Sequence, residues 1–208
     1  MPKEWDGIVS QNINRKISKP TARFLVAHTK ITPNQMTVLG FLVAVLSGIC
    51  FSLFNGILGG ILAQLSSILD GVDGDIAILT GKTSVFGGFL DSILDRYGDC
   101  VILIAMIYNV LFTYENVLIM VAVAIAALFG SVMVSYSRAR AESDLNVIFK
   151  SGFSGYAANR DVRLFIIMIG GILNQIFASL LLLALLTNAV VLKRIYDSWK
   201  ISLNFANT

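Results

Sequence analysis

Charged residues are scarce in this 208-residue chain. Asp, Glu, Lys and Arg make up only 14% of it, against about 25% in a soluble globular domain. The single histidine and the two cysteines, Cys50 and Cys100, show no metal-ligand spacing, which argues against a metal site built from His and Cys. Hydrocarbon is abundant, because 56% of the residues are hydrophobic and the mean hydropathy is +0.76. This composition is typical of an integral membrane protein, and we expect no nucleic-acid partner.

Long apolar segments recur along the chain. A membrane-spanning helix needs about 20 such residues, and we identify six candidate spans, near residues 36–54, 58–79, 85–112, 117–138, 162–173 and 176–195. The fifth is short and is followed by Asn174-Gln175, which favours a tight hairpin with the sixth. The predicted fold class is all-α, a polytopic membrane protein with six transmembrane helices. We expect one domain over residues 1–208, with the bundle at about 32–200.

The N-terminal segment, residues 1–31, has a different pattern. Residues 8–30 alternate apolar and basic positions, which suits an amphipathic helix lying in the headgroup plane of a membrane. The first residues are polar and lack the early apolar stretch of a cleavable signal peptide. We therefore predict an interfacial helix ahead of the bundle.

The basic residues predict the orientation. None of the 16 Lys and Arg residues falls in the loops expected on the far side, near 55–57, 113–116 and 174–175. Lys and Arg are enriched in cytoplasmic loops. We expect a multi-pass protein of the cell membrane with both termini and the active site cytoplasmic.

Two pairs of aspartates interrupt the apolar runs. Asp70 and Asp73 lie one helical turn apart, and Asp91 and Asp95 share a face of the next segment. The short turn at residues 80–84 places both pairs at similar depth in an antiparallel hairpin. Carboxylates without nearby His or Cys favour hard cations, Mg²⁺ or Mn²⁺ first and Ca²⁺ as an alternative. Four carboxylates suit two ions, which can clamp a phosphoryl group.

Glycines accompany these aspartates. Gly74 follows Asp73, and Gly87 lies one turn before Asp91. Glycine inside a helix costs about 1 kcal/mol relative to alanine, so its presence indicates a close approach. Two explanations of these glycines remain open: they leave room for a bulky ligand, or they allow ordinary helix packing by small residues.

The spacing Asp70-x-x-Asp73-Gly74-x-x-Ala77 with Gly87-x-x-x-Asp91-x-x-x-Asp95 resembles the signature of the CDP-alcohol phosphotransferase family. The resemblance covers nearly the whole chain. Residues 32–37 (TPNQMT) are similar to the family's segment at the start of the first span, residues 136–142 (YSRARAE) to the end of its fourth helix, and residues 159–163 (NRDVR) to the start of its fifth. One position departs, because the family pattern has Arg where this chain has Ile78. Lys82, four residues on, is our hypothesis for a replacement.

The resemblance implies an enzyme that transfers a substituted phosphate group from a CDP-linked donor to an acceptor alcohol and releases CMP. It implies metal ligation by Asp70, Asp73, Asp91 and Asp95, with Asp95 also the candidate general base. It also implies nucleotide contacts from Thr32, Pro33, Asn34, Thr37, Gly74, Ala77, Lys82 and Gly87. A homodimer is expected from the family alone.

Four arginines favour a phosphorylated acceptor: Arg138, Arg140, Arg160 and Arg163. Their forked donors fit phosphate, although anchoring to anionic lipid is the alternative. Within the family the chain is most similar to enzymes that use inositol phosphate, such as the transferase domain of di-myo-inositol-phosphate-phosphate synthase. Inositol 1-phosphate is therefore weakly preferred as acceptor over glycerol 3-phosphate, the acceptor of a phosphatidylglycerophosphate-type synthase. The reaction is expected to belong to phospholipid or inositol-phosphodiester biosynthesis. An intramembrane prenyltransferase and a divalent-cation transporter are remoter alternatives.

Overall fold

The computed structural model describes residues 9–113, 116–149 and 152–206, and within these ranges it contains helices and no strands. A π-helical turn, η1 (Ser10–Asn14), leads into α1 (Arg15–His28). The other helices are α2 (Pro33–Ser52), α3 (Gly56–Thr80), α4 (Val85–Thr113), α5 (Val117–Leu145), α6 (Gly152–Tyr156), α7 (Arg160–Ile172) and α8 (Ile176–Ala206). Each of the six predicted apolar segments is helical, so the all-α prediction is confirmed.

Local sequence signals explain several helix ends. Thr32 caps α2 in a capping box with Gln35, and Pro33 occupies the first helical turn, where its missing N–H costs nothing. The Asn55 side chain accepts a hydrogen bond from Leu58 N at 3.1 Å and so begins α3. Gly81 ends α3 with a φ of +65°, a left-handed conformation that glycine adopts without strain. Gly81 thus begins the short turn that joins α3 to α4.

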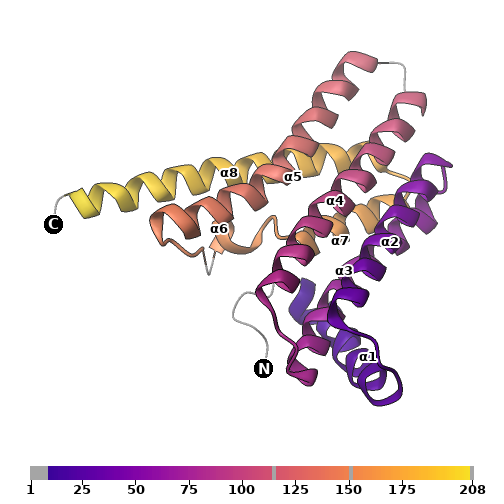
Figure 1. The fold of residues 1–208 in the computed structure, drawn as a ribbon. Coiled ribbons are helices and arrows are strands. Elements are labelled where there is room, and N and C mark those ends of the chain that lie inside the picture. The colour runs from indigo at the N-terminus through magenta and orange to yellow at the C-terminus, as the bar shows by residue number, and fades with distance from the viewer. Residues whose placement is uncertain (1–8, 114–115, 150–151, 207–208) are drawn as a thin grey trace.

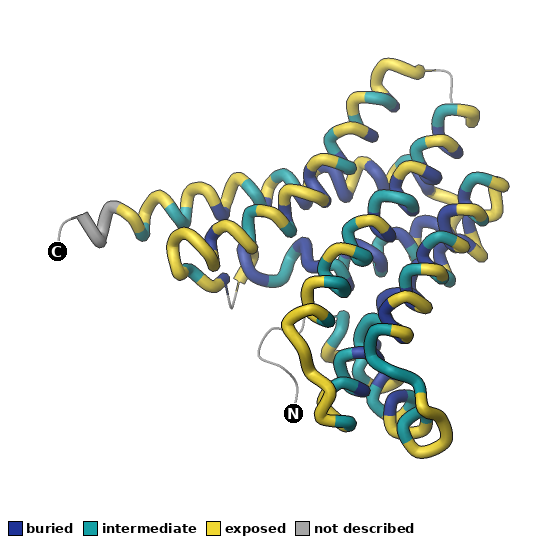
Figure 2. Tube along the Cα trace, in the orientation of Figure 1, coloured by how far each residue is buried: buried dark blue, intermediate teal, exposed yellow. Residues whose placement is uncertain are grey.

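The helices pack as two groups that meet around α3, α4 and α7 (Figure 1). Helix α2 packs against α3 and α4, α1 lies against α3, and the long α5 and α8 pack against each other. Helix α7 packs against α3, where glycines allow contact between backbones: a Cβ on Gly171 would lie 2.3 Å from the Gly56 carbonyl oxygen. The buried residues lie mostly where these helices meet (Figure 2).

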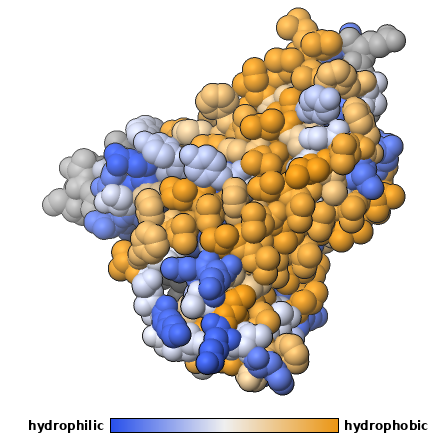
Figure 3. Space-filling model, turned by 45° about the vertical axis from the view of Figure 1, so that its right-hand side comes forward, coloured by the Kyte–Doolittle hydropathy of each residue, from blue (hydrophilic) through white to orange (hydrophobic). Residues whose placement is uncertain are grey.

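Among the described residues, four helices are long and apolar enough to cross a membrane: Pro33–Ser52, Val85–Thr113, Val117–Leu145 and the part of α8 from Ile176 to Ser202. The predicted second and fifth spans correspond to α3 and α7 and are not among them. Helix α3 carries three aspartates, and α7 is only 13 residues long. Hydrophobic residues cover the middle of the molecule, and hydrophilic residues gather mostly at the lower and left-hand parts of the view (Figure 3). The chain is therefore a membrane protein by length and composition.

Candidate active site: a carboxylate cluster between two cavities

Three aspartates on the α3–α4 hairpin form a compact cluster. One carboxylate oxygen each from Asp70, Asp91 and Asp95 lie within 4.8 Å of one another. Asp91 Oδ1 is buried and has no hydrogen-bond partner among the described residues. A buried carboxylate oxygen without a partner is costly, and a cation held by these oxygens would satisfy it. The donor set is oxygen only, so the residues fit a hard divalent cation such as Mg²⁺ or Mn²⁺.

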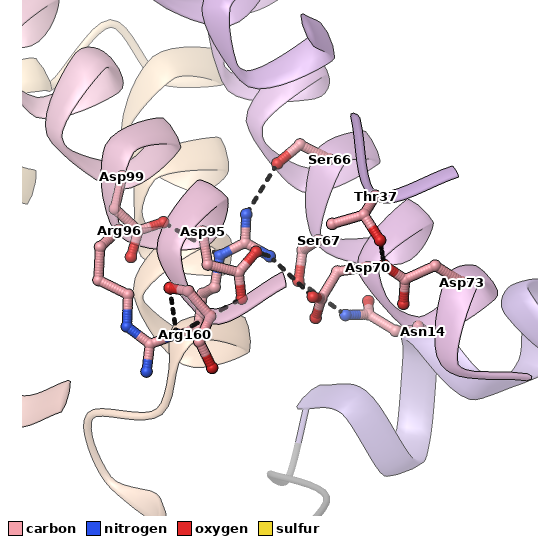
Figure 4. A network of polar contacts seen from close by, with 12 residues as sticks. Asn14, Thr37, Ser66, Ser67, Asp70, Asp73, Asp95, Arg96, Asp99 and Arg160 are labelled. Carbon is pink, nitrogen blue, oxygen red and sulfur yellow. Dashed lines mark hydrogen bonds and ion pairs between the residues drawn. The ribbon is translucent and has the colours of Figure 1, made fainter. Parts of the chain in front are cut away.

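Asp73 belongs to the same region but has a different partner. It is 6% exposed, and its Oδ2 accepts a hydrogen bond from Thr37 Oγ1 at 2.5 Å. Asp73 still lines a polar cavity together with Asp70 and Asp91. The four predicted carboxylates are thus neighbours, with three in the tight cluster and the fourth held by α2. Figure 4 shows three of them, Asp70, Asp73 and Asp95.

Asp75 points away from the cluster, as its position in the sequence indicates. Its carboxylate accepts hydrogen bonds from Arg15 Nη1 at 2.8 Å and from Ser18 Oγ at 3.1 Å. A second link joins η1 to α3, because Asn14 Nδ2 donates to Ser67 Oγ at 3.0 Å. Polar side chains therefore attach η1 and α1 to α3, beside the aspartates.

A cavity of about 190 Å³ opens on one side of the carboxylates. It lies between the start of α2 and the α3–α4 turn, with Asp73 and Asp91 in its wall. Seven of the eight residues predicted to contact the nucleotide line it: Pro33, Asn34, Thr37, Gly74, Ala77, Lys82 and Gly87. The eighth, Thr32, caps α2 next to it. Ile78, at the position where the family has arginine, also lines this cavity, as does Lys82. We call it the hairpin cavity.

A second cavity, of about 180 Å³, lies on the other side and is rich in arginine. Five arginines line it, with Asp95, Asp99 and three uncharged residues: Arg96, Arg138, Arg160, Arg163 and Arg194. Three of the four predicted acceptor arginines are present. The fourth, Arg140, lies outside, pairs with Asp144 at 2.6 Å and is largely exposed. We call this the arginine cavity.

Two arginines of this cavity have no carboxylate partner within ion-pair distance among the described residues. Arg138 Nη2 donates to the Gly155 carbonyl at 2.9 Å. Arg194, only 2% exposed, donates to the carbonyls of Ser154 and Val134 and lies over the Phe149 ring. A buried charge is expensive unless it is paired, so an anion in this cavity would meet two guanidinium groups that have no carboxylate partner.

The sequence interpretation missed three charged members of the arginine cavity, Arg96, Arg194 and Asp99. Arg194 lies near the end of the last apolar run, where a basic residue is typical of membrane anchoring. Only the return of the chain through α6 places Ser154 and Phe149 against it. Asp99 did carry a signal, since it continues the four-residue spacing of Asp91 and Asp95. It accepts hydrogen bonds from Arg160 Nε at 3.1 Å and from Arg163 Nη2.

Arg160 connects the arginine cavity to the carboxylate cluster (Figure 4). Its Nη1 lies 3.0 Å from Asp95 Oδ1 and 3.5 Å from Asp70 Oδ1. Asp91 lines the hairpin cavity and Asp95 lines the arginine cavity, so the carboxylate cluster lies between the two cavities. Such an arrangement can bring two phosphate-bearing molecules to one metal centre from opposite sides.

Comparison with known proteins agrees with this geometry. The sequence profile of the CDP-alcohol phosphatidyltransferase family matches residues 30–195. The chain belongs to this family. Family membership and the carboxylate cluster together support dependence on a divalent metal.

Two relatives have informative names. The chain is 42% identical over 199 residues to a bifunctional IPC transferase and DIPP synthase of Aquifex aeolicus, covering 94% of this chain and 45% of that protein. It is 37% identical over 190 residues to an archaetidylinositol phosphate synthase of Pyrococcus horikoshii, covering 90% of this chain and 95% of that protein. The chain thus spans less than half the length of the bifunctional relative and nearly all of the archaeal one.

Solved structures of another protein have a similar fold. Phosphatidylinositol phosphate synthase PgsA1 of Mycobacterium tuberculosis, solved with CDP-DAG bound, has a TM-score of 0.75 at 24% identity and covers 88% of this chain and 94% of its own. The same protein in complex with manganese and citrate has a TM-score of 0.76, also at 24% identity, with coverage of 88% and 89%. At this identity the similarity concerns the fold.

Proposed function

We propose that this protein is a metal-dependent CDP-alcohol phosphotransferase whose acceptor is a phosphorylated alcohol, with inositol 1-phosphate preferred over glycerol 3-phosphate. The observation that carries the proposal is the placement of the carboxylate cluster between the hairpin cavity and the arginine cavity. A neutral acceptor would not need a cavity lined by five arginines. The relatives named for inositol phosphate products support inositol 1-phosphate.

We assign the donor's cytidine and pyrophosphate to the hairpin cavity. Thr32, Pro33, Asn34, Thr37, Gly74, Ala77, Lys82 and Gly87 would surround them. A Cβ on Gly87 would lie 3.1 Å from Asn34 Oδ1 and 3.0 Å from Ser84 Oγ, so glycine keeps this side of the cavity open. Lys82 supplies positive charge where the family arginine is replaced by Ile78.

Asp70, Asp91 and Asp95, with Asp73 beside them, would hold the divalent cation, for which four carboxylates allow two ions. The bound metal neutralises negative charge on the donor's pyrophosphate and on the group in transfer. Arg138, Arg160, Arg163 and Arg194 would bind the acceptor's phosphate and so position its hydroxyl. Arg140 lies outside the cavity and is left with a role at the protein surface.

The transfer forms a bond between the acceptor oxygen and the donor's β-phosphorus and breaks the bond between that phosphorus and CMP. Asp95 is placed to accept the proton that the acceptor hydroxyl loses. Because Asp95 Oδ1 lies 3.0 Å from Arg160 Nη1, we assign the proton to Oδ2. Most of the catalytic effect then comes from positioning and charge neutralisation.

The membrane arrangement belongs to the same proposal. Helices α3 and α7 would complete six spans, since their apolar residues lie between helices that are themselves long enough to cross. The α1 helix would lie at the interface, with its basic residues toward anionic headgroups. Both termini and the two cavities would face the cytoplasm, residues 1–208 would form one domain, and the protein would act as a homodimer.

The test is a radiolabelled acceptor screen on the purified protein with Mg²⁺ or Mn²⁺. Acceptors are inositol 1-phosphate, glycerol 3-phosphate, inositol and serine, and donors are CDP-inositol, CDP-diacylglycerol and a CDP-linked archaeal ether lipid. We expect a labelled phosphodiester from inositol 1-phosphate and little from unphosphorylated inositol. Labelled product from inositol or serine alone would contradict a phosphorylated acceptor, and glycerol 3-phosphate as the better substrate would replace the preferred one.

A further inference from the structure

Asp99 has no role in the chemistry described so far, although it is the most closely engaged carboxylate of the arginine cavity. It is 6% exposed, and each of its oxygens accepts a hydrogen bond from a different arginine. Both arginines, Arg160 and Arg163, come from the first turn of α7, whereas Asp99 lies on α4, one turn beyond Asp95. The carboxylate therefore holds two of the arginines assigned to the acceptor.

We propose that Asp99 is a positioning residue that fixes the guanidinium groups of Arg160 and Arg163 for the acceptor's phosphate. The inference rests on the proposed function, because it requires the arginine cavity to bind that phosphate. Asp99 itself repels a phosphate, so its effect on binding acts through the two arginines that it holds.

The geometry of each arginine supports this role. Arg160 is held through Nε by Asp99 and through Nη2 by Ser66 Oγ at 3.3 Å, which leaves Nη1 directed toward the carboxylate cluster. Arg163 is held through Nη2 by Asp99 and through Nη1 by the Ala158 carbonyl at 2.9 Å. With two nitrogens of each guanidinium held, the direction of the remaining N–H groups is set before an acceptor arrives. Preorganised donors lose less entropy on binding.

A purely structural ion pair between α4 and α7 is the alternative explanation. Helix α7 packs mainly against α3 and α8, and α4 packs mainly against α2 and α5. Asp99, Arg160 and Arg163 all line the arginine cavity. Their ion pairs therefore lie in the wall of that cavity and not within a tightly packed contact between two helices. A link in that place has its largest effect on whatever occupies the cavity.

The test compares Asp99→Asn with the wild type in detergent. The amide keeps the size of the side chain but removes the charge and one acceptor for the arginines. We expect the acceptor KM for inositol 1-phosphate to rise about tenfold, which corresponds to about 1.4 kcal/mol. The donor KM and the affinity for Mn²⁺, measured by electron paramagnetic resonance, should stay within about twofold. Asp99→Glu, which retains the charge, should recover part of the loss.

Asp75→Asn is a matched control, because it also removes an aspartate that pairs with an arginine. That arginine is Arg15, which does not line the arginine cavity. It should leave the acceptor KM unchanged. A double-mutant cycle of Asp99→Asn with Arg163→Lys should be non-additive if Asp99 acts through that arginine. Additive effects would contradict the inference.

Other results overturn the proposal directly. A folded Asp99→Asn enzyme with an unchanged acceptor KM would do so, and so would equal losses for donor and acceptor together with a lower unfolding temperature, which would mark a structural role. Failure of both Asp99 variants to fold would also mark a structural role. Acceptor binding is measured separately, as the rise in unfolding temperature with inositol 1-phosphate. If the wild type binds inositol 1-phosphate but releases no CMP, the proposed function fails. The role of Asp99 is then still decided by comparing the ligand-induced rise in unfolding temperature of Asp99→Asn with that of the wild type.

Discussion

At the residue scale, the carboxylates of the α3–α4 hairpin carry the account. Their grouping follows from spacing that is visible in the sequence, since residues three or four apart share a helix face. The side chains that form hydrogen bonds with these carboxylates could not be predicted from the sequence. Asp73 is held by Thr37 from α2, and Asp99 by two arginines of α7. Contacts between side chains far apart in sequence depend on packing that no local pattern records.

Asp91 gives the sharpest test at this scale, because its buried Oδ1 has no partner among the residues described. We predict that Asp91→Asn weakens Mn²⁺ binding at least about tenfold and lowers turnover by a factor of about 10² or more, in line with the loss of a positioned charge in a catalytic site. Metal binding is measured by electron paramagnetic resonance and turnover by CMP release. Asp75→Asn is the control, and an Asp91→Asn protein with wild-type affinity for Mn²⁺ would refute the assignment.

Lys82 and Ile78 give a second test in the hairpin cavity. If Lys82 replaces the family arginine, Lys82→Ala should raise the donor KM about tenfold, since it removes a charged hydrogen bond to phosphate worth about 1.5–3 kcal/mol. Ile78→Arg added to Lys82→Ala should restore much of the loss. The measurement is CMP release against donor concentration. Intact activity in Lys82→Ala, with a gain from Ile78→Arg alone, would rule out this replacement.

At the element scale, the apolar segments were predictable and their ends were less so. The predicted fourth segment stops near residue 138, whereas α5 continues to Leu145, and α8 continues well beyond residue 195. Polar residues end an apolar run without ending a helix, because helical hydrogen bonding continues wherever the ends can reach water. Helix α3 contains polar residues within its length and is still a continuous helix of 25 residues. With its aspartates, it is not among the helices that are long and apolar enough to cross a membrane.

The contact between α3 and α7 depends on glycine, which leads to a prediction at this scale. A Cβ on Gly171 would lie 2.3 Å from the Gly56 carbonyl oxygen and 3.1 Å from Gly60 Cα. Both are backbone atoms and cannot rotate away. We predict that Gly171→Ala destabilises the protein by about 1–3 kcal/mol through overpacking, seen as a lower unfolding temperature in detergent. Gly88→Ala, where no atom lies within 4 Å of the added Cβ, is the control. Equal unfolding temperatures for the two variants would contradict this packing.

At the scale of the whole molecule, the distribution of basic residues predicts an orientation that can be measured. After replacement of Cys50 and Cys100, single cysteines at Asn55 and at Thr29 should react differently with an impermeant thiol reagent on intact cells. Asn55, between α2 and α3, should be labelled from outside, and Thr29, between α1 and α2, only after the membrane is opened. Both residues are exposed, so burial does not explain a difference. The reverse labelling pattern would contradict a cytoplasmic active site.

The sequence predicted the residues of the hairpin cavity more completely than those of the arginine cavity. Seven of the eight residues assigned to the nucleotide line one cavity, because the motif that names them is local to a hairpin and a neighbouring helix start. The arginine cavity draws on α4, α5, α7 and α8. Three of the four arginines predicted to bind the acceptor line it, Arg140 lies outside it, and Arg96 and Arg194 were not predicted. A site assembled from four helices requires the packing of all four to be known.

The central claim is that a metal-bearing carboxylate cluster transfers a group from a CDP-linked donor to a phosphorylated acceptor. CMP release by the purified protein tests it most directly, with donor and inositol 1-phosphate present, with Mn²⁺ or with a chelator, and in the wild type and Asp91→Asn. We predict CMP release that requires the metal, the acceptor's phosphate and Asp91. CMP release that persists in the chelator, or no CMP from any donor in the panel, would contradict the account.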